Sequence, residues 1–183
     1  SAMSYFDLQV NGYAGIDFNS GFLTTEQARV ACEAMLEDGT TGALATVITD
    51  SIESMKGKLQ RLVRACEEDE VVREVLVGLH IEGPFLNQAD GFIGAHPRDW
   101  TRPATVDAMK ELLEAAGGLT RIVTLAPECD EGSATTRFLA GEGIVVSAGH
   151  CDPSLDQLRA AIDAGLSMFT HLGNGCPMQL QRH

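Results

Sequence analysis

The sequence predicts an α/β protein in which helices cover a parallel β-sheet. Six short apolar runs rich in β-branched residues alternate with amphipathic stretches of helical period. The apolar runs are continuous rather than alternating, as expected for strands that are buried on both faces of a parallel sheet. An open doubly wound sheet and a (β/α) barrel both fit this order. GYAGIDFNSG does not have the G-x-G-x-x-G spacing of a dinucleotide-binding loop, and no phosphate-loop fingerprint occurs.

The elements follow one another along the chain, strand before helix. Thr24 is a good N-terminal cap, Gly117 and Gly118 end a helix, and Pro153 precedes the start of another. Strands are expected at 5–10, 42–49, 74–81, 121–128, 143–150 and 167–172. Helices are expected at 24–39, 51–70, 106–118, 133–143 and 154–165.

The charge of the chain excludes some classes of partner. There are 26 acidic residues against 13 Lys and Arg, which gives a formal charge of −13, and no basic cluster interrupts this excess. Nucleic acid and anionic membranes are therefore not expected partners. A compact anionic substrate remains compatible with the sequence, because one well-placed arginine or a helix N-terminus can bind a phosphate locally.

Length and cysteine content indicate one cytoplasmic domain. The length of 183 residues is nearer one domain than two. The five cysteines are spread widely without a C-x-x-C pair, which indicates reduced thiols. No apolar run reaches the roughly 20 residues of a membrane span, and no secretion signal is recognised. Ser1 and Ala2 before Met3 suggest a tag remnant, so the predicted domain is residues 3–183.

Polar residues able to bind a metal ion stand at the ends of three of the six predicted strands. They are Glu82, His150 and His171. In a barrel, the carboxyl ends of the strands carry the chemistry, so one carboxylate and two imidazoles would converge there. This ligand set suits Zn²⁺ or Fe²⁺ and leaves a coordination position for water.

Other polar residues near these strand ends have ordinary structural alternatives. Residues two apart on a strand share a face, so Gln9 pairs with Asn11 and His80 with Glu82. Gln9 and Asn11 are also candidates for turn residues before Gly12, since Asn-Gly often forms turns. A histidine on an apolar strand is more often a hydrogen-bonded core residue than a ligand. Cys151 is either a further soft ligand or a small buried hydrophobe, and His96 either contacts a ligand or caps a loop.

Five motifs together resemble the N-acetylglucosamine-6-phosphate deacetylases of the amidohydrolase superfamily. DLQVNGYAG, GLHIEGPFLN, GFIGAHP, VSAGH and THLGNGCP occur in the order and at about the spacing seen in that family. The resemblance spans essentially the whole chain. It implies a distorted TIM barrel of the amidohydrolase type, with about six of its eight βα units in this chain.

The resemblance also implies a set of site residues. Glu82, His150 and His171 would bind one divalent metal ion, Zn²⁺ in preference to Fe²⁺. Gln9-Val10-Asn11 stands where many superfamily members have the H-x-H of a second metal, so a mononuclear site is implied, with Gln9, Asn11 and His80 as its neighbours. The implied substrate contacts are Ala95 and His96 to the sugar, Asn174 and Gly175 as hydrogen-bond donors to the phosphosugar, and Arg182 to the phosphate.

The implied reaction is hydrolysis of the acetamide of N-acetylglucosamine 6-phosphate to glucosamine 6-phosphate and acetate. The catalytic aspartate of the family ends an eighth strand, so it is expected beyond His183. The small β-sandwich that precedes the first strand in relatives is not expected in this chain. Homodimers are common among similar proteins, so a dimer is compatible with the resemblance.

Departures from the family pattern leave alternatives open. The chain reads Asn174-Gly175-Cys176-Pro177 where the family usually has Asn-Ala-Met-Pro. An amidohydrolase that acts on a cyclic amide or an amine is one alternative. A noncatalytic module that binds a metal or a sugar phosphate is another, since the catalytic aspartate has no counterpart in the chain.

Overall fold

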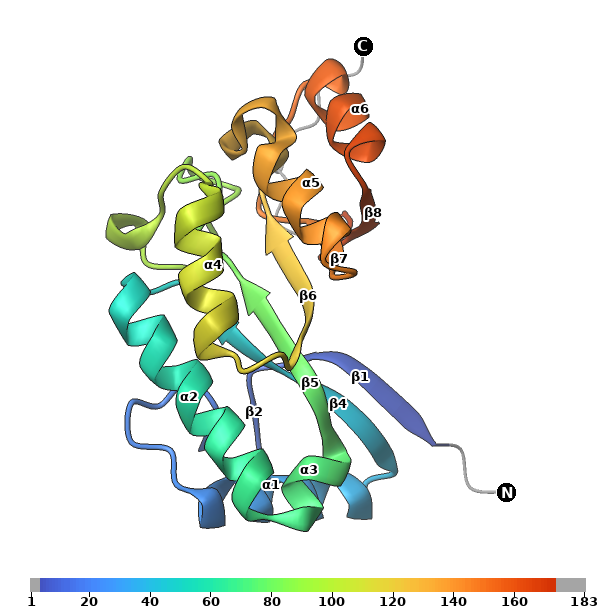
Figure 1. Ribbon diagram of the computed structural model, residues 1–183. Helices are drawn as coiled ribbons and strands as arrows, with labels where there is room; N and C mark the ends of the chain where they lie inside the picture. The colour runs from blue at the N-terminus through green and yellow to red at the C-terminus, as the bar shows by residue number, and fades with distance from the viewer. Residues whose placement is uncertain (1–3, 174–183) are drawn as a thin grey trace. The chain divides into compact units, whose positions relative to one another are not determined.

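A computed structural model describes residues 4–173 of the chain (Figure 1). The residues group into two compact units, which we describe separately. The first contains the chain up to Ile48 together with Ile52–Ile81 and Lys110–Arg121. The second contains Thr49–Ser51, Glu82–Met109 and the chain from Ile122 onward. No helix in residues 4–173 is long and apolar enough to cross a membrane.

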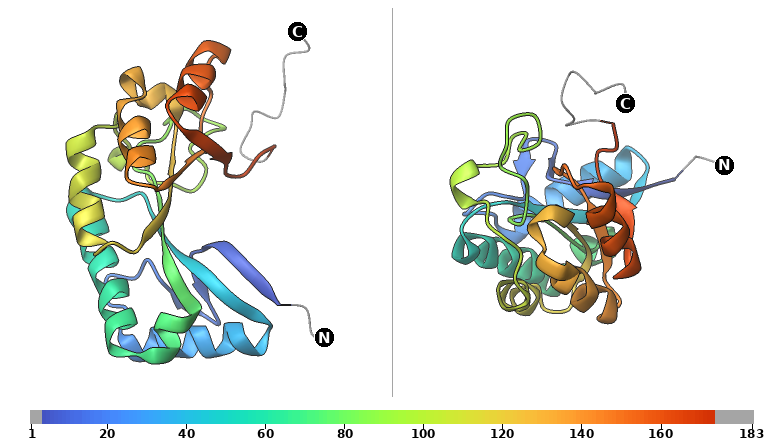
Figure 2. Two further views of the ribbon diagram at one scale, coloured as in Figure 1. Left: turned by 45° about the vertical axis from the view of Figure 1, so that its right-hand side comes forward. Right: turned by 90° about the horizontal axis from the view of Figure 1, so that it is seen from above.

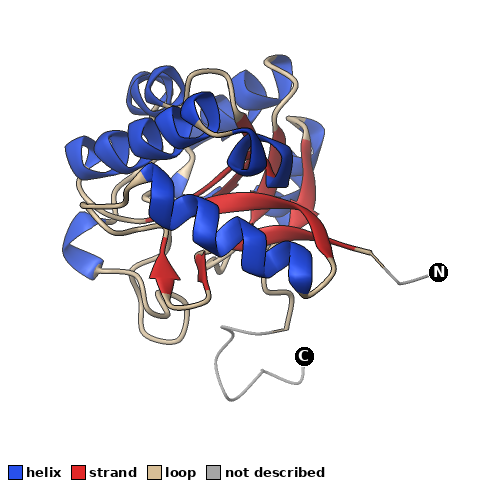
Figure 3. Ribbon diagram, turned by 90° about the horizontal axis from the view of Figure 1, so that it is seen from below, coloured by secondary structure: helices blue, strands red, loops and turns tan. Residues whose placement is uncertain are grey.

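Strands and helices alternate in the predicted order. Figure 3 shows the strands in red and the helices in blue. The main sheet has six strands in the order β1-β4-β5-β6-β7-β8, and the pairings of β1 with β4, β6 with β7 and β7 with β8 are parallel. The strands are β1 Tyr5–Val10, β4 Thr40–Ile48, β5 Leu76–Glu82, β6 Thr120–Leu125, β7 Val145–Ala148 and β8 Leu166–Phe169. The helices are α1 Thr25–Glu37, α2 Ile52–Glu68, α3 Glu70–Val75, α4 Val106–Ala115, α5 Ala134–Gly141 and α6 Leu155–Asp163. This confirms the predicted α/β class with a parallel sheet.

The first unit packs α1, α2 and α3 against one another beside β4 (Figure 2). Helix α1 begins at Thr24, whose side chain accepts from the Gln27 backbone N–H while the Gln27 side chain accepts from the Thr24 backbone N–H. This capping box satisfies two donors that the first helical turn would leave without partners. Each of these elements has apolar side chains that are almost completely buried, and burial of a Val, Leu or Met side chain stabilises by about 1.5–3 kcal/mol. They include Met35, Ala45, Leu59, Leu62 and Val72.

The second unit is built on β6, β7 and β8 with α5 and α6. Strands β7 and β8 pair so that Ala148 lies opposite Phe169, the last residue of each strand. A second capping box, Ser154 with Gln157, starts α6. Gly149 follows β7 in a place without room for a side chain, since a Cβ there would lie 2.6 Å from Cγ2 of Thr124. The same Cβ would lie 3.1 Å from Cβ of Thr170, which follows β8, so the ends of β6, β7 and β8 lie closely against one another.

The structure differs from the sequence prediction at several element ends. Residues 74 and 75 belong to α3, not to the third strand, because Asp69 caps a short helix by accepting from the Val72 N–H. The sixth predicted strand ends at Phe169, and residues 127–129 after β6 form a 3-10 turn. A small hairpin, β2 Gly12–Tyr13 and β3 Ile16–Asp17, follows β1.

The hairpin corrects the alternative that Asn11-Gly12 forms a turn. The turn lies instead at Ala14 and Gly15, which have φ angles of 50° and 80°. Gly12 lies in β2, where a Cβ would meet the backbone oxygen of Ile16 at 2.2 Å. The glycine is therefore needed for close strand approach and not for turn geometry.

Candidate metal centre

Three strand ends supply Glu82, His150 and His171. Glu82 is the last residue of β5 and is 2% exposed. His150 comes two residues after β7 ends and His171 comes two residues after β8 ends. Because the ends of β7 and β8 lie opposite each other, the two histidines leave the sheet at the same level. All three residues belong to the second unit.

Both histidines have an unusual backbone conformation. The φ angle is 50° at His150 and 58° at His171, in the left-handed region that side chains with a Cβ rarely adopt. Such conformations cost about 1–3 kcal/mol each and occur most often at functional sites. Here the conformation turns each imidazole toward Glu82 directly after its strand.

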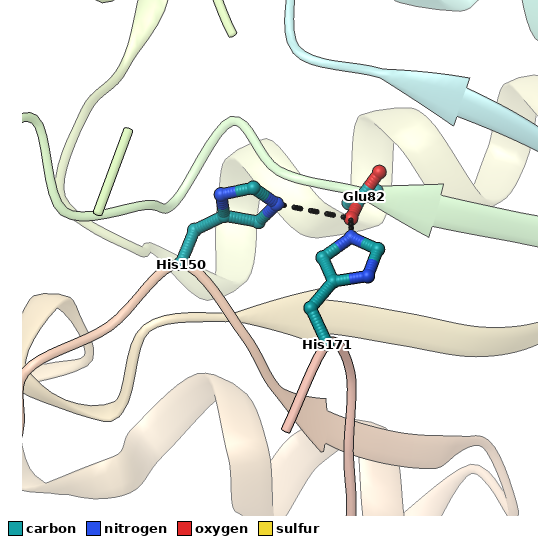
Figure 4. A group of neighbouring side chains, drawn as sticks. All are labelled: Glu82, His150 and His171. Atoms are coloured by element: carbon teal, nitrogen blue, oxygen red, sulfur yellow. Dashed lines mark hydrogen bonds and ion pairs between the residues drawn. The ribbon is translucent and has the colours of Figure 1, made fainter. Parts of the chain in front are cut away.

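The donor atoms of the three side chains converge (Figure 4). Nε2 of His171 lies 2.9 Å from Oε1 of Glu82, and Nε2 of His150 lies 3.2 Å from the same oxygen. One ligand atom from each of the three residues lies within 4.8 Å of the others. Within residues 4–173 this is the one group of three or more such side chains with this proximity.

The orientation of His150 is set by the loop after β5. Nδ1 of His150 lies 2.8 Å from the carbonyl oxygen of Phe92. A carbonyl only accepts, so Nδ1 carries the proton and donates it, and Nε2 is directed at Glu82. Gly94 allows this loop to approach the ring, since a Cβ there would lie 3.1 Å from Cε1 of His150. Burial lowers the pKa of His150, but the hydrogen bonds to Glu82 and Phe92 and the charge of Glu82 outweigh burial and raise it.

His96 joins the cluster through a second chain of hydrogen bonds. Its Nε2 lies 3.7 Å from Oε2 of Glu82, and its Nδ1 lies 2.9 Å from Oγ1 of Thr49. The Thr49 hydroxyl donates to the Glu82 carbonyl oxygen at 3.4 Å, so it accepts from Nδ1–H of His96. Burial lowers the pKa of His96 to about 4, although Glu82 opposes this shift. His96 is therefore neutral at physiological pH.

The cluster has the charge distribution of a cation site. In a neutral His150 ring, Nε2 presents a lone pair to a carboxylate that has only acceptor atoms. The two groups repel at 3.2 Å unless a proton or a cation lies between them. A divalent metal ion would turn this repulsion into coordination, and a set of imidazole nitrogens with a carboxylate oxygen suits Zn²⁺ or Fe²⁺. The residues present therefore fit the metal that the sequence predicts.

The remaining predicted site residues fall into three places. Ala95 is exposed next to buried His96 in the second unit. Gln9, Asn11 and His80 belong to the first unit. Nδ1 of buried His80 donates to the Leu8 carbonyl oxygen at 3.1 Å. Asn174, Gly175 and Arg182 lie outside the described residues, so their roles stay predictions.

Thr49 and Cys151 adjoin members of the cluster, His96 and His150. Thr49 was missed, although it ends the second predicted strand, and the rule that polar strand ends carry the chemistry could have found it. The sequence predicts Cys151 either as a soft ligand or as a buried hydrophobe. It is partly exposed and does not belong to the group of converging ligand atoms.

Comparisons with known proteins agree with the fold. A parallel α/β sheet with ligand residues at its strand ends is the arrangement of an amidohydrolase-type (β/α) barrel. The chain is 37% identical over 171 residues to N-acetylglucosamine-6-phosphate deacetylase from Bacillus subtilis, with 92% of this chain and 42% of that protein covered. It is 36% identical over 173 residues to an N-acetylgalactosamine-6-phosphate deacetylase from a Shewanella strain, with 93% and 41% covered. No family model matches.

The solved structures give the same likeness. The crystal structure of N-acetyl-D-glucosamine-6-phosphate deacetylase from Mycobacterium smegmatis has a TM-score of 0.84 and 30% identity, and covers 96% of this chain and 44% of that one. A mutant of that enzyme was solved in complex with N-acetyl-D-glucosamine-6-phosphate. The chain spans less than half the length of these relatives. The resemblance to the N-acetylglucosamine-6-phosphate deacetylases, and with it the amidohydrolase barrel class, is confirmed.

Proposed function

We propose that the chain contributes the metal-binding part of a deacetylase that acts on N-acetylated hexosamine 6-phosphates. The substrate proposed first is N-acetylglucosamine 6-phosphate, which would give glucosamine 6-phosphate and acetate. The convergence of Glu82, His150 and His171 is the observation that carries this proposal. The names of the relatives support the substrate class.

In this proposal one divalent metal ion is held by Glu82, His150 and His171. Zn²⁺ is the first candidate for this ion and Fe²⁺ the second. When bound, the ion supplies Lewis acidity toward the amide carbonyl and lowers the pKa of water. The carboxylate contributes one negative charge, and the two imidazoles are neutral when they act as ligands. The strand ends and the Phe92 carbonyl hold these side chains in position before any ligand arrives, which reduces the cost of ordering them on binding.

His96 is suited to contact the substrate as a hydrogen-bond acceptor. Its Nδ1–H is used by Thr49, so Nε2 of the neutral ring has a lone pair. It can accept from a hydroxyl or amide N–H of a bound sugar. Asn174, Gly175 and Arg182 keep their predicted roles in this proposal, with Arg182 making a bidentate contact to the phosphate. The general base is the aspartate predicted beyond His183.

The epimer N-acetylgalactosamine 6-phosphate is the second candidate substrate. It is favoured by one observation, because the Shewanella relative that is named for this sugar is 36% identical to the chain. The two sugars differ only in the configuration at one carbon. The cluster around Glu82 is directed at the acetamide with either sugar, so it does not distinguish them.

The test is acetate release, with added Zn²⁺, by a full-length protein that includes the predicted aspartate, because a chain that ends at His183 is expected to release little or none. Each of the two phosphosugars and unphosphorylated N-acetylglucosamine would be supplied in turn. We expect release from a phosphosugar, strong dependence on the phosphate, and loss of activity in Glu82→Gln. A protein that binds Zn²⁺ but releases no acetate from either phosphosugar would contradict the deacetylase and favour the noncatalytic module. The proposal includes a cytoplasmic location and a homodimer, and gel filtration of the full chain would check the dimer.

A further inference from the structure

Glu128 connects the loops that follow three strands of the sheet. It lies in the turn Pro127–Cys129 after β6. Its Oε1 accepts from Nδ2 of Asn87 at 2.8 Å, in the loop after β5. The same oxygen accepts from the backbone N–H of Asp152 at 2.6 Å, in the loop after β7. One carboxylate oxygen thus ties together the segments that follow Glu82 and His150.

Asn87 continues this connection to the metal ligand His150. Its backbone N–H donates to the His150 carbonyl oxygen at 3.0 Å. Its Oδ1 accepts from the Ala89 N–H at 2.9 Å, and the Ala89 carbonyl accepts from the Phe92 N–H at 3.2 Å. The Phe92 carbonyl in turn accepts Nδ1–H of His150. Both the backbone and the ring of His150 are therefore held by the segment that Asn87 anchors.

The second oxygen of Glu128 makes this arrangement unusual. Oε2 is buried and has no hydrogen-bond partner among the described residues. A buried acceptor without a partner costs about 1–3 kcal/mol. Glu128 therefore bears a free-energy cost at one oxygen while its other oxygen joins two loops. This combination favours a role in positioning over a role in stability.

We infer that Glu128 and Asn87 form a brace that positions His150 for metal binding. The inference rests on the proposed metal role of His150. Partners in the outer shell of a metal site fix the ring orientation of a histidine ligand, and their loss typically weakens metal binding about 10- to 100-fold. Glu128 does not belong to the group of converging ligand atoms, and the Asn87 backbone N–H bonds the His150 carbonyl oxygen, so both act through His150 as positioning residues.

Asn87→Asp tests the brace with little change in shape. It removes the Nδ2 donor and places a second carboxylate beside Oε1 of Glu128, while Oδ1 can still accept from Ala89. Gln88→Glu is the matched control, because it adds the same charge at the next, exposed position. We expect Co²⁺ to bind the full-chain Asn87→Asp protein about 10- to 100-fold more weakly than the control. We also expect its visible absorption spectrum with Co²⁺ to change, while the spectrum of the control matches wild type.

The double variant Asn87→Asp with Glu128→Gln provides a rescue. With its amide nitrogen at the position of Oε1, Glu128→Gln donates to the new carboxylate and removes one of the two facing negative charges, but it gives up the contact with the Asp152 N–H. We therefore expect only part of the lost affinity to return. If Asn87→Asp yields too little folded protein, Asn87→Ala removes the donor without adding charge and allows the same comparison. Equal Co²⁺ affinity and an equal spectrum in the Asn87 variant and the control would overturn the brace. These measurements contain no substrate, so a wild-type protein that binds Co²⁺ but releases no acetate would contradict the proposed function alone.

Discussion

Replacing Glu82 by glutamine should abolish metal binding and yet leave the metal-free protein at least as stable as wild type. Glu82 is 2% exposed and faces Nε2 of His150 and His171 at 3.2 and 2.9 Å. In the absence of metal, the buried carboxylate bears a desolvation cost that is offset only when a facing imidazole is protonated. A glutamine amide would instead donate to one imidazole nitrogen, and such a hydrogen bond contributes about 1 kcal/mol.

Bound metal should stabilise the folded protein by more than this hydrogen bond does, and only in the wild-type protein. At a free Zn²⁺ concentration of roughly 100 times the dissociation constant, binding stabilises the folded state by about 2.7 kcal/mol. At about 2–4 °C per kcal/mol for a protein of this size, the melting temperature should rise by roughly 5–11 °C. Glu82→Gln should show no rise with Zn²⁺ and a metal-free melting temperature about 2–4 °C above wild type.

Differential scanning calorimetry of the full chain, with chelator and then with Zn²⁺, measures both quantities. Glu142→Gln is the matched control, since Glu142 is exposed and its replacement removes the same charge far from the cluster in sequence. A Glu82→Gln protein that keeps the metal-dependent rise would refute Glu82 as a ligand. A metal-free Glu82→Gln protein less stable than wild type would refute the argument from the desolvation of the Glu82 carboxylate.

Three further changes have directions set by the structure. Gly149→Ala places a Cβ 2.6 Å from Cγ2 of Thr124. We expect the free energy of unfolding, measured in urea, to fall by about 1–3 kcal/mol and Zn²⁺ to bind more weakly. An unchanged free energy of unfolding and unchanged Zn²⁺ affinity would contradict the tight contact. Thr170→Val removes a buried hydroxyl whose oxygen lies 2.9 Å from the hydroxyl oxygen of Thr124. The free energy of unfolding should fall by about 1–3 kcal/mol, and Thr170→Ser, which keeps the hydroxyl, should recover most of this loss. Burial raises the pKa of Cys32 to about 12 and of Cys66 to about 11 from 9.0. As pH rises, the thiols ionise in the unfolded state before they ionise in the folded state. The free energy of unfolding should therefore fall between about pH 9 and pH 11, by about 1 kcal/mol per thiol at pH 10. Urea titrations at several pH values check this, and the Cys32→Ala variant should show a smaller fall.

The order of strands and helices followed from the sequence because both patterns are local. Continuous apolar runs predict buried strands, and signals such as the Thr24 cap and Pro153 mark helix starts within a few residues. Element ends were less well predicted. Residues 74 and 75 read as strand from their neighbours, but the cap that Asp69 provides makes them helical. The hairpin turn falls at Ala14-Gly15 and not at Asn11-Gly12.

The sequence by itself determined which side chains are chemically able to bind a metal, since Glu82, His150 and His171 could be named from their strand ends and from the family motifs. Only the tertiary structure decided that their ligand atoms lie within 4.8 Å of one another. It alone also decided that the Phe92 carbonyl selects the His150 tautomer and that Glu128 joins loops from separate strands. The physical reason is that strand propensity and capping depend on neighbouring residues, whereas ring orientation and tautomer depend on contacts between residues distant in the chain, such as Glu82 and His171.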